Sequence, residues 1–252
     1  MRSTARERQV NKVNFKTYKK EGEYSYALGA SVAIELLRTN PKDCLGVILS
    51  PNYTDKEGII EGLCEAHNIP IEQNQKLLGI LSPKENCFVA AAFAKRRHVL
   101  DKNKTHVVLD QPSDMGNLGA CMRSCAGFRV YDLAVIGAGA DAYNPKAIRA
   151  SMGAFFHVRV QYFESIRGYL DIYQNNREIY TFMLKADHVL QGLAADKNEV
   201  RSLIFGNEAS GLDYGTYKDI GKSVVIAHSD KIDSLALPAA VSIALFSMSP
   251  PR

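Results

Sequence analysis

Short apolar runs alternate along the chain with segments whose apolar residues recur at the three- and four-residue spacing of a helix. In the C-terminal part, the apolar runs predict strands at 106–110, 132–137, 158–163, 179–184, 202–206 and 223–227. Helices are predicted at 117–126, 145–156, 166–175, near His188 and over 237–248. Nearly continuous apolar strands that alternate with helices are typical of a parallel sheet covered on both faces, so we predict an α/β fold.

The N-terminal part carries a second, shorter alternation of the same kind. Its pattern predicts helices at 24–40, 55–68 and 75–82, and strands at 44–50, 69–73 and 87–94. The charged stretch from Ala94 to Lys104 lacks periodicity over much of its length, which is typical of a linker. We therefore expect a basic N-terminal arm at 1–23, a small α/β domain at 24–98 and a larger domain at 104–252.

The bulk composition, with 46% hydrophobic and 23% charged residues among 252, is that of a soluble globular protein. The formal net charge of +4 is modest, but the first twenty residues are strongly basic. They hold Arg2, Arg6, Arg8, Lys12, Lys16, Lys19 and Lys20 against Glu7 alone. Such an arm favours a polyanion such as RNA or DNA, and a solvated, poorly ordered terminus explains it equally well.

The cysteines point to a reducing compartment. They form no CxxC pair and are Cys44, Cys64, Cys87, Cys121 and Cys125. This odd set suits buried thiols in the cytoplasm, and no histidine lies at a ligand-like spacing nearby, so we expect no metal site. No apolar run approaches the roughly 20 residues that a membrane helix requires, and the N-terminus lacks a signal-peptide core. We therefore expect a cytoplasmic protein that does not bind membranes.

Four strand ends carry unusual residues, and ligands of parallel sheets collect at such ends. After the strand 106–109, the helical spacing places small residues and one arginine on a single face of the next helix. These residues are Gly119, Ala120, Arg123, Ala126 and Gly127, if Asn117 opens the helix. The face is nearly flat, so it permits close approach by another backbone or a ligand, with Arg123 as its one long charged group.

The second strand end, with the sequence GAGADA at 137–142, imitates the glycine fingerprint of dinucleotide-binding proteins. It leads into Tyr-Asn-Pro instead of directly into a helix, so the match is weak. A nucleotide-dependent oxidoreductase is therefore an alternative that rests on this stretch alone.

The third and fourth strand ends combine glycines with polar side chains. The turn Gly206–Gly211 contains Glu208, which either receives a hydrogen-bond donor at a site or caps the following segment. Ser234 and Leu235 come just before the last helix, where Ser234 is either functional or a simple N-cap. Pro238 must lie near the first turn of that helix, since a deeper position would remove a backbone hydrogen bond.

Together and in this order, the strand ends resemble the motifs of the SpoU/TrmH-type RNA ribose 2'-O-methyltransferases of the SPOUT superfamily. The first motif, N-x-G-A-x-x-R, is similar to Asn117–Arg123, and the second, G-x-E-x-x-G, is similar to Gly206–Gly211. The third, I-P-M followed by S-L-N-V, aligns with Ile226–His228 and with Ser234–Leu237. The similarity covers residues 104–250.

The resemblance implies a C-terminal parallel-sheet domain with a deep trefoil knot, preceded at 24–98 by a small ribosomal-protein-like domain that binds the substrate. It also implies a homodimer that uses S-adenosyl-L-methionine to methylate a ribose of structured rRNA or tRNA. The cofactor would lie against Phe205, Gly206, Gly211, Ile226, His228 and Leu235. The reaction site would be built from Asn117, Arg123, Glu208 and Ser234, with Arg123 meeting the methyl donor of the other subunit.

Two departures from the family pattern concern the third motif. Ala227 and His228 stand where the family has Pro and Met, and Ala236 replaces the usual Asn. Because the lost amide could position substrate or cofactor, a catalytically weakened or inactive RNA-binding protein of the same fold is the alternative. In the enzyme, Arg123 would stabilise the attacking oxygen, and Ser234 or a water would pass on the proton.

Overall fold

The structure is a computed structural model that describes residues 15–82, 87–193 and 199–248. Contacts between residues divide the chain into two compact units, Met1–Lys95 and Arg96–Arg252.

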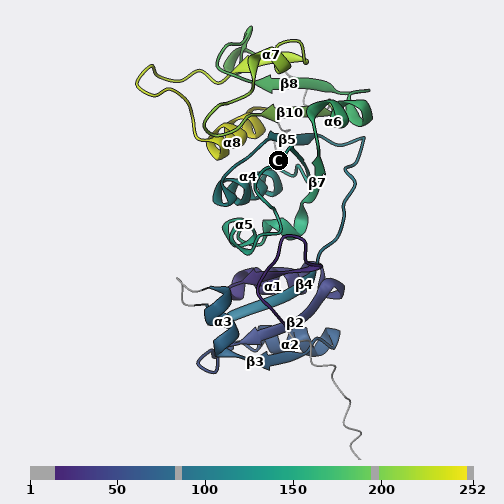
Figure 1. Ribbon diagram of the computed structural model, residues 1–252, viewed down its shortest axis with the longest axis vertical. Helices are drawn as coiled ribbons and strands as arrows, with labels where there is room; N and C mark the ends of the chain where they lie inside the picture. The colour runs from purple at the N-terminus through teal and green to yellow at the C-terminus, as the bar shows by residue number, and fades with distance from the viewer. Residues whose placement is uncertain (1–14, 83–86, 194–198, 249–252) are drawn as a thin grey trace, which may run out of the picture. The chain divides into compact units, whose positions relative to one another are not determined.

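The first unit is a small mixed sheet with helices (Figure 1). Its elements are β1 (Tyr24–Leu28), α1 (Ala30–Thr39), η1 (Pro41–Asp43), β2 (Cys44–Leu49), α2 (Ile59–His67), β3 (Ile71–Gln73), α3 (Gln75–Leu81) and β4 (Val89–Ala94). The strands lie in the order β1-β4-β2-β3, with β4 antiparallel to both of its neighbours and β3 parallel to β2.

The single helix predicted over 24–40 is wrong in its first part. Residues Tyr24–Leu28 form an edge strand against β4, and α1 begins only after Gly29. Gly29 has a φ of 97°, a conformation that favours glycine, and so separates strand from helix. Tyr26 is completely buried in this sheet. Tertiary pairing with a strand more than sixty residues away therefore overrides the local helical spacing.

The side chain of Lys95, at the end of the first unit, contacts the segment that precedes β1. Its Nζ donates to the carbonyls of Lys19 and Lys20, at 3.1 and 2.8 Å, and lies 4.5 Å from the centre of the Tyr18 ring. This ammonium therefore fixes the segment that precedes β1.

The second unit is a seven-stranded parallel sheet with helices on both faces. Its elements are β5 (His106–Asp110), α4 (Met115–Gly127), β6 (Asp132–Ile136), α5 (Pro145–Ala150), η2 (Ala154–His157), β7 (Arg159–Phe163), α6 (Ile166–Tyr173), β8 (Glu178–Phe182), β9 (His188–Val189), η3 (Leu190–Gly192), β10 (Arg201–Phe205), α7 (Tyr214–Tyr217), β11 (Lys222–Val225) and α8 (Leu237–Met248). The strand order is β7-β6-β5-β10-β8-β11-β9, and every pairing is parallel. The predicted α/β fold with a parallel sheet is confirmed.

Two predicted helices of this unit differ from the structure. The helix expected near His188 is the two-residue strand β9 followed by the single 3₁₀ turn η3. The helix expected over 145–156 ends at Ala150, because Met152 and Gly153 take positive φ values of 53° and 91°. A short 3₁₀ segment follows this break. Neither irregularity has a periodic signal in the sequence.

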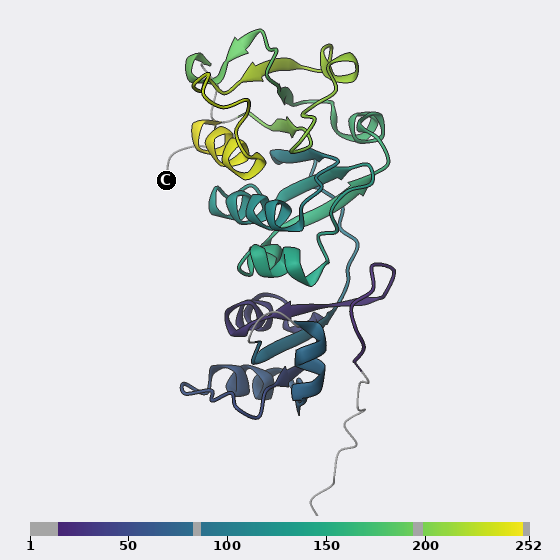
Figure 2. The same cartoon turned by 60° about the vertical axis from the view of Figure 1, so that its left-hand side comes forward.

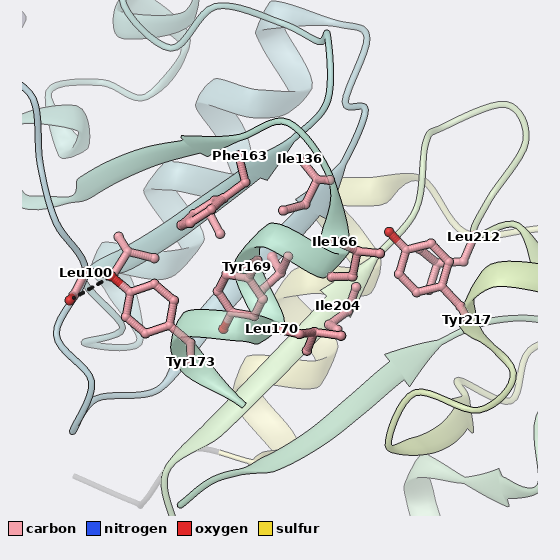
Figure 3. Packing of buried hydrophobic residues seen from close by; sticks show 12 residues of the cluster. Leu100, Ile136, Phe163, Ile166, Tyr169, Leu170, Tyr173, Ile204, Leu212 and Tyr217 are labelled. Carbon is pink, nitrogen blue, oxygen red and sulfur yellow. Dashed lines mark hydrogen bonds between the residues drawn. The ribbon is translucent and has the colours of Figure 1, made fainter. Parts of the chain in front are cut away.

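Aromatic and aliphatic side chains fill the two faces of the sheet. On one face, α6 contributes Tyr169, Leu170 and Tyr173, which pack against strand residues such as Phe163 and Ile204 (Figure 3). On the other face lie α4, α5 and α8, with α4 between the other two (Figures 1 and 2). The helices therefore hold the sheet rigid from both sides while its carboxyl edge stays free for loops.

Elements from the last third of the chain lie between or against elements that come earlier in the sequence. Strand β10 lies between β5 and β8, although both come earlier in the sequence. After β11 the chain crosses back, and α8 packs against α4. The Ser124 and Ser242 hydroxyls are 2.8 Å apart, and the rings of Phe128 and Phe246 meet edge to face. This return places the loop before α8 at the carboxyl edge.

Gly119 of α4 provides a test of the packing between α4 and α5. A Cβ atom there would lie 2.4 Å from the Ala147 carbonyl oxygen, whereas a Cβ at Gly127 meets nothing within 4 Å. We expect Gly119→Ala to lower the free energy of unfolding by about 1–3 kcal/mol through overpacking. The matched Gly127→Ala should be neutral or stabilising by up to about 1 kcal/mol, since alanine favours helix. Denaturant unfolding measures both, and equal effects would contradict the packing described.

Candidate functional site

A pocket of about 330 Å³ opens at the carboxyl ends of β8, β10 and β11. Its lining comes from four segments, namely 182–185, 205–214, 224–228 and 234–240. Phe182 and Phe205 stack in this wall, with ring centres 4.4 Å apart and planes 10° from parallel. Much of the remaining lining comes from the segments that follow these strands. The pocket therefore offers flat apolar surface beside peptide groups, which suits a small molecule with a planar ring.

The turn after β10 is shaped by a close crossing of the chain over itself. A Cβ on Gly206 would lie 2.1 Å from the carbonyl carbon of Gly211 and 2.2 Å from the nitrogen of Leu212, so only glycine fits. Gly211 itself has a φ of 68°. The Asn207 side chain caps the turn, because its Oδ1 accepts from the amides of Ala209 and Ser210 at 2.9 and 3.4 Å. The spacing of glycines in the second motif is thus a packing requirement.

Glu208 ties this turn to the loop that precedes α4. Its Oε2 accepts from the amide and the hydroxyl of Ser113, both at 2.9 Å. Its Oε1 accepts from the Asp114 amide at 3.3 Å and from Nδ2 of Asn117 at 3.2 Å. Partial burial by itself would raise the pKa of Glu208, but these hydrogen bonds together lower that pKa to about 2. The Glu208 carboxylate therefore links the first motif to the second.

Asn117 lies inside α4 and does not open it as expected. The helix begins at Met115, and Asp114 is the N-cap, since its Oδ1 accepts from the Asn117 amide at 2.8 Å. From this position the side-chain amide of Asn117 donates to Oε1 of Glu208. Two predicted reaction-site residues, Asn117 and Glu208, are therefore in direct contact.

The small-residue face of α4 is only partly an open surface. Gly119 is buried against the backbone of α5, so this part of the face packs within the chain. Arg123 is exposed, and none of the described residues forms a hydrogen bond or an ion pair with its guanidinium. It does not line the pocket of its own chain. Among the four predicted reaction-site residues, Glu208 and Ser234 thus line the pocket, whereas Asn117 and Arg123 of α4 do not.

The third motif lines the opposite side of the pocket. Ile226, His228, Ser234 and Leu235 all contribute to the wall. The Nδ1 atom of His228 lies 2.8 Å from the Ile226 carbonyl oxygen, which requires that nitrogen to carry the proton. All predicted cofactor-binding residues, including Phe205, Gly206 and Gly211, line the same pocket.

Ser234 is not the N-cap of the last helix. That helix begins at Leu237, and the carbonyl of Ala236 accepts from the amides of Ala239 and Ala240. The cap position therefore belongs to Ala236, which leaves the hydroxyl of Ser234 available at the pocket. Pro238 lies in the first turn, as predicted.

The glycines of the GAGADA stretch have a packing role. Gly137 has a φ of 70°, and a Cβ on Gly139 would lie 2.7 Å from the carbonyl oxygen of Pro112 in the loop before α4. The helix α5 starts only at Pro145, so no helix N-terminus follows these glycines directly. The hypothesis of a nucleotide-dependent oxidoreductase therefore lacks the glycine turn leading directly into a helix that dinucleotide binding requires.

Sequence reasoning missed several residues of the site. Ser113, Asn207 and Phe182 hold or line it without belonging to the motif positions. Phe182 ends β8, whereas the predicted strand ran on to Leu184, so the pattern did not mark Phe182 as a strand end. The contacts of Ser113 and Asn207 depend on loop geometry and left no signal in the pattern.

Metal-binding clusters and membrane-spanning helices are absent from the described residues. Among the described residues, no group of three or more His, Cys, Asp or Glu side chains is placed to hold a metal ion. No helix in the described part of the chain is long and apolar enough to cross a membrane. All five cysteines are free thiols, and only Cys44 is more than slightly accessible.

The fold and the pocket together define a parallel α/β domain whose pocket is formed by the segments that follow adjacent strands. The SpoU rRNA Methylase family matches residues 104–246, more than half of the chain, and this protein belongs to that family. It is 27% identical over 144 residues to the 23S rRNA (guanosine(2553)-2'-O)-methyltransferase RlmP of Bacillus subtilis (strain 168). It is 29% identical over 129 residues to the 23S rRNA (uridine(2479)-2'-O)-methyltransferase of Streptomyces viridochromogenes.

These alignments cover 56% and 49% of this chain, and the chain spans about half the length of the relatives, 56% and 45%. The crystal structure of the SpoU methyltransferase AviRb from Streptomyces viridochromogenes, in complex with the cofactor AdoMet, is similar with a TM-score of 0.76. The match covers 88% of each chain at 18% sequence identity, so it shows a shared fold.

The Glu208 contacts predict a specific dependence of stability on pH. In the unfolded chain the carboxyl titrates near its ordinary pKa of about 4.3, and in the folded chain near 2. The stabilisation is therefore complete above about pH 4.3 and is lost as the pH falls through about 2. We expect Glu208→Gln to cost about 1–3 kcal/mol at pH 7, with the difference from wild type shrinking toward pH 2.

Denaturant unfolding between pH 2.5 and 7 measures this difference. Glu164, exposed at the end of β7, offers the matched control Glu164→Gln, which should leave stability unchanged. A constant gap between wild type and Glu208→Gln across this pH range would refute the assigned contacts.

Proposed function

We propose that the protein is an RNA ribose 2'-O-methyltransferase that uses S-adenosylmethionine and acts on structured rRNA or tRNA. The observation that carries the proposal is the convergence of all three motif segments at the carboxyl edge of one sheet. The second and third motifs line the pocket, and Glu208 bonds the first motif to the second. Family membership and relatives named as rRNA 2'-O-methyltransferases support the same activity.

The pocket fits the cofactor by its chemistry. The stacked Phe182 and Phe205 rings offer an apolar wall for the adenine, and the turn at 206–211 and the segment 226–228 offer peptide groups for its polar edge. When bound, S-adenosylmethionine supplies an electrophilic methyl group on a sulfonium. Gly206 and Gly211 permit backbone to approach the ligand closely.

The active form is a homodimer in this proposal, because Arg123 lies outside the pocket of its own chain. The surface beside it favours a second copy. On α8, which packs against α4, the side chain of Phe246 is 75% exposed and that of Ile243 is 37% exposed. Large apolar side chains on a helix face of this kind are typical of an interface between subunits. A twofold contact there would carry Arg123 to the pocket of the partner.

The side chains divide the chemistry between them. A ribose hydroxyl is a weak nucleophile near neutral pH, so it requires orientation and stabilisation of the charge that develops on its oxygen. The guanidinium of Arg123 would provide that charge and hold the adjoining phosphate. Glu208 is a poor base, since its pKa is about 2 and its oxygens already accept four hydrogen bonds. Ser234 or a water would instead pass on the proton.

The trefoil knot is part of the proposal and has support in the strand order. β10 lies between two strands that precede it, and α8 returns to α4 only after β11 has paired on the far side of β8. The close crossing of Gly206 by the Gly211–Leu212 peptide fits a tightly drawn loop in that region.

RNA recognition is assigned to the first unit as a ribosomal-protein-like substrate-binding domain, and to its basic residues. Most of the predicted basic arm lies outside the described residues, and Lys16, Lys19 and Lys20 are the part that the structure describes. Lys95 is occupied by contacts within the chain, and Arg97, which is exposed in the charged stretch 94–104, is a further basic candidate. RNA shape, read over such a surface, would set specificity.

Arg123 permits a direct test of action between subunits. Arg123→Lys should keep the charge but lose the planar fork, so we expect turnover to fall by about 100-fold or more while S-adenosylhomocysteine still binds. Mixing Arg123→Ala subunits with Ser234→Trp subunits, whose pockets are filled, should restore about a quarter of wild-type activity. Each mixed dimer has one intact site, and half of the dimers are mixed. No recovery on mixing would overturn action in trans.

Phe246 tests the dimer itself. Phe246→Glu places a charge on the apolar surface of α8, so we expect a monomer in analytical ultracentrifugation and a loss of turnover. Ile172, exposed on α6 at the other face of the sheet, gives the control Ile172→Glu, which should remain dimeric. A dimeric Phe246→Glu protein would place the interface elsewhere.

The function as a whole is tested by mapping ribose methylation in RNA from cells with and without this gene. Loss of one or more 2'-O-methyl groups would support the enzyme and name its nucleotide. Unchanged methylation, together with RNA binding by the purified protein, would favour the noncatalytic alternative that Ala236 raises.

A further inference from the structure

The backbone of Ala227 is held by a side chain from another element. Oε1 of Gln191 accepts from the Ala227 amide at 3.3 Å, and Nε2 of Gln191 donates to the Ala227 carbonyl at 3.2 Å. One side-chain amide therefore satisfies both backbone groups of a single residue. The assignment of the two Gln191 atoms follows from the contact, because a backbone amide can only donate and a carbonyl can only accept.

The position of this contact in the sheet explains its form. The parallel ladder between β9 and β11 pairs Val224 with His188 and Val225 with Val189. At Leu190 the chain turns into η3 and its backbone leaves the ladder. The Gln191 amide then continues the pairing from its side chain, in the place that the next peptide of β9 would occupy.

The two-residue strand β9 is fixed at its other end as well. The Asp187 amide donates to the Ser223 hydroxyl at 2.9 Å, and that hydroxyl donates to the Asp187 carboxylate at 2.8 Å. The side chain of Leu190 is buried. Gln191 is thus held by a short, well-anchored segment, although its own side chain is exposed.

Ala227 lies in the chain between two residues that line the pocket. Ile226 and His228 line it, whereas the side chain of Ala227 points outward and is exposed. In the family motif this position is proline, whose ring fixes φ. An alanine has no such restriction, so the backbone here needs another constraint, and His228 adds one by its bond to the Ile226 carbonyl.

We propose that Gln191 is a positioning residue for the cofactor: its amide fixes the Ala227 backbone and so presets the main-chain groups at Ile226 and His228 that would meet the ligand. This inference rests on the proposed function. Gln191 does not line the pocket and acts only through Ala227. In this chain a side-chain clamp takes over the role of a proline ring.

The first test measures the clamp in the absence of any ligand. Hydrogen exchange of the Ala227 amide should become several-fold faster in Gln191→Ala, because its acceptor is removed. Gln191→Glu retains an oxygen for that amide and should keep most of the protection. Gln174, exposed at the end of α6 without a hydrogen bond from its side chain to any described residue, provides the matched control Gln174→Ala. Equal exchange in all four proteins would overturn the clamp.

The second test measures S-adenosylhomocysteine binding by calorimetry. We expect Gln191→Ala to raise the dissociation constant about tenfold, and Gln191→Glu to raise it by a smaller factor, because the Ala227 amide keeps its acceptor while the bond to the Ala227 carbonyl is lost. Gln174→Ala should bind like wild type. In turnover assays KM for the methyl donor should rise while kcat changes little.

The third test is rescue by proline. Ala227→Pro alone removes the backbone N–H that donates to Oε1 of Gln191, so it should weaken the binding of S-adenosylhomocysteine. In the Gln191→Ala background the same proline should instead recover part of the lost affinity, because it restricts φ where the clamp is missing.

The outcomes separate the clamp from the proposed function. If wild type does not bind S-adenosylhomocysteine, the proposed function fails, whatever the exchange rates show. If wild type binds and Gln191→Ala binds equally well, the positioning role is refuted while the function stands. Strictly additive effects of the two substitutions would also contradict it. Near-ultraviolet circular dichroism confirms that each variant is folded.

Discussion

The site depends on one carboxylate that is used as an acceptor. Glu208 receives hydrogen bonds from Ser113, Asp114 and Asn117, so the loop before α4 and the turn after β10 cannot move independently. These two segments are about ninety residues apart in the chain. The charge is what makes the contact effective, because hydrogen bonds to an ionised acceptor are roughly twice as strong as neutral ones. Everything proposed about the pocket assumes this junction.

Around that junction, the pocket is lined by segments that follow the strands, and a few residues fix the course of their main chain. Glycine permits the crossing at 206 and 211, Asn207 caps the turn, and Gln191 holds the loop at 227. A site of this kind tolerates changes of side chain in its walls as long as the main chain keeps its course. That is a physical reason why His228 and Ala236 can depart from the family pattern without removing the pocket.

The sequence predicted the strands of the second unit well, because buried parallel strands are continuously apolar and bounded by turns. It failed where pairing with a distant strand determines the secondary structure. Tyr24–Leu28 has helical spacing but pairs with β4, and His188 belongs to a strand of two residues. Motif spacing brought Asn117, Glu208 and Ser234 to one edge of the sheet. It could not show that Asp114 caps α4 or that Gly119 packs on α5, since both depend on loop geometry and helix phase.

The central place of β10 has a consequence for synthesis on the ribosome. Until residues 201–205 have emerged, β5 and β8 each present an unpaired edge, and the sheet exists only as incomplete pieces. Open strand edges of nascent chains pair readily with other chains. A chain arrested before β10 is therefore expected to depend on chaperones, whereas emergence of β10 and β11 would close the sheet from within.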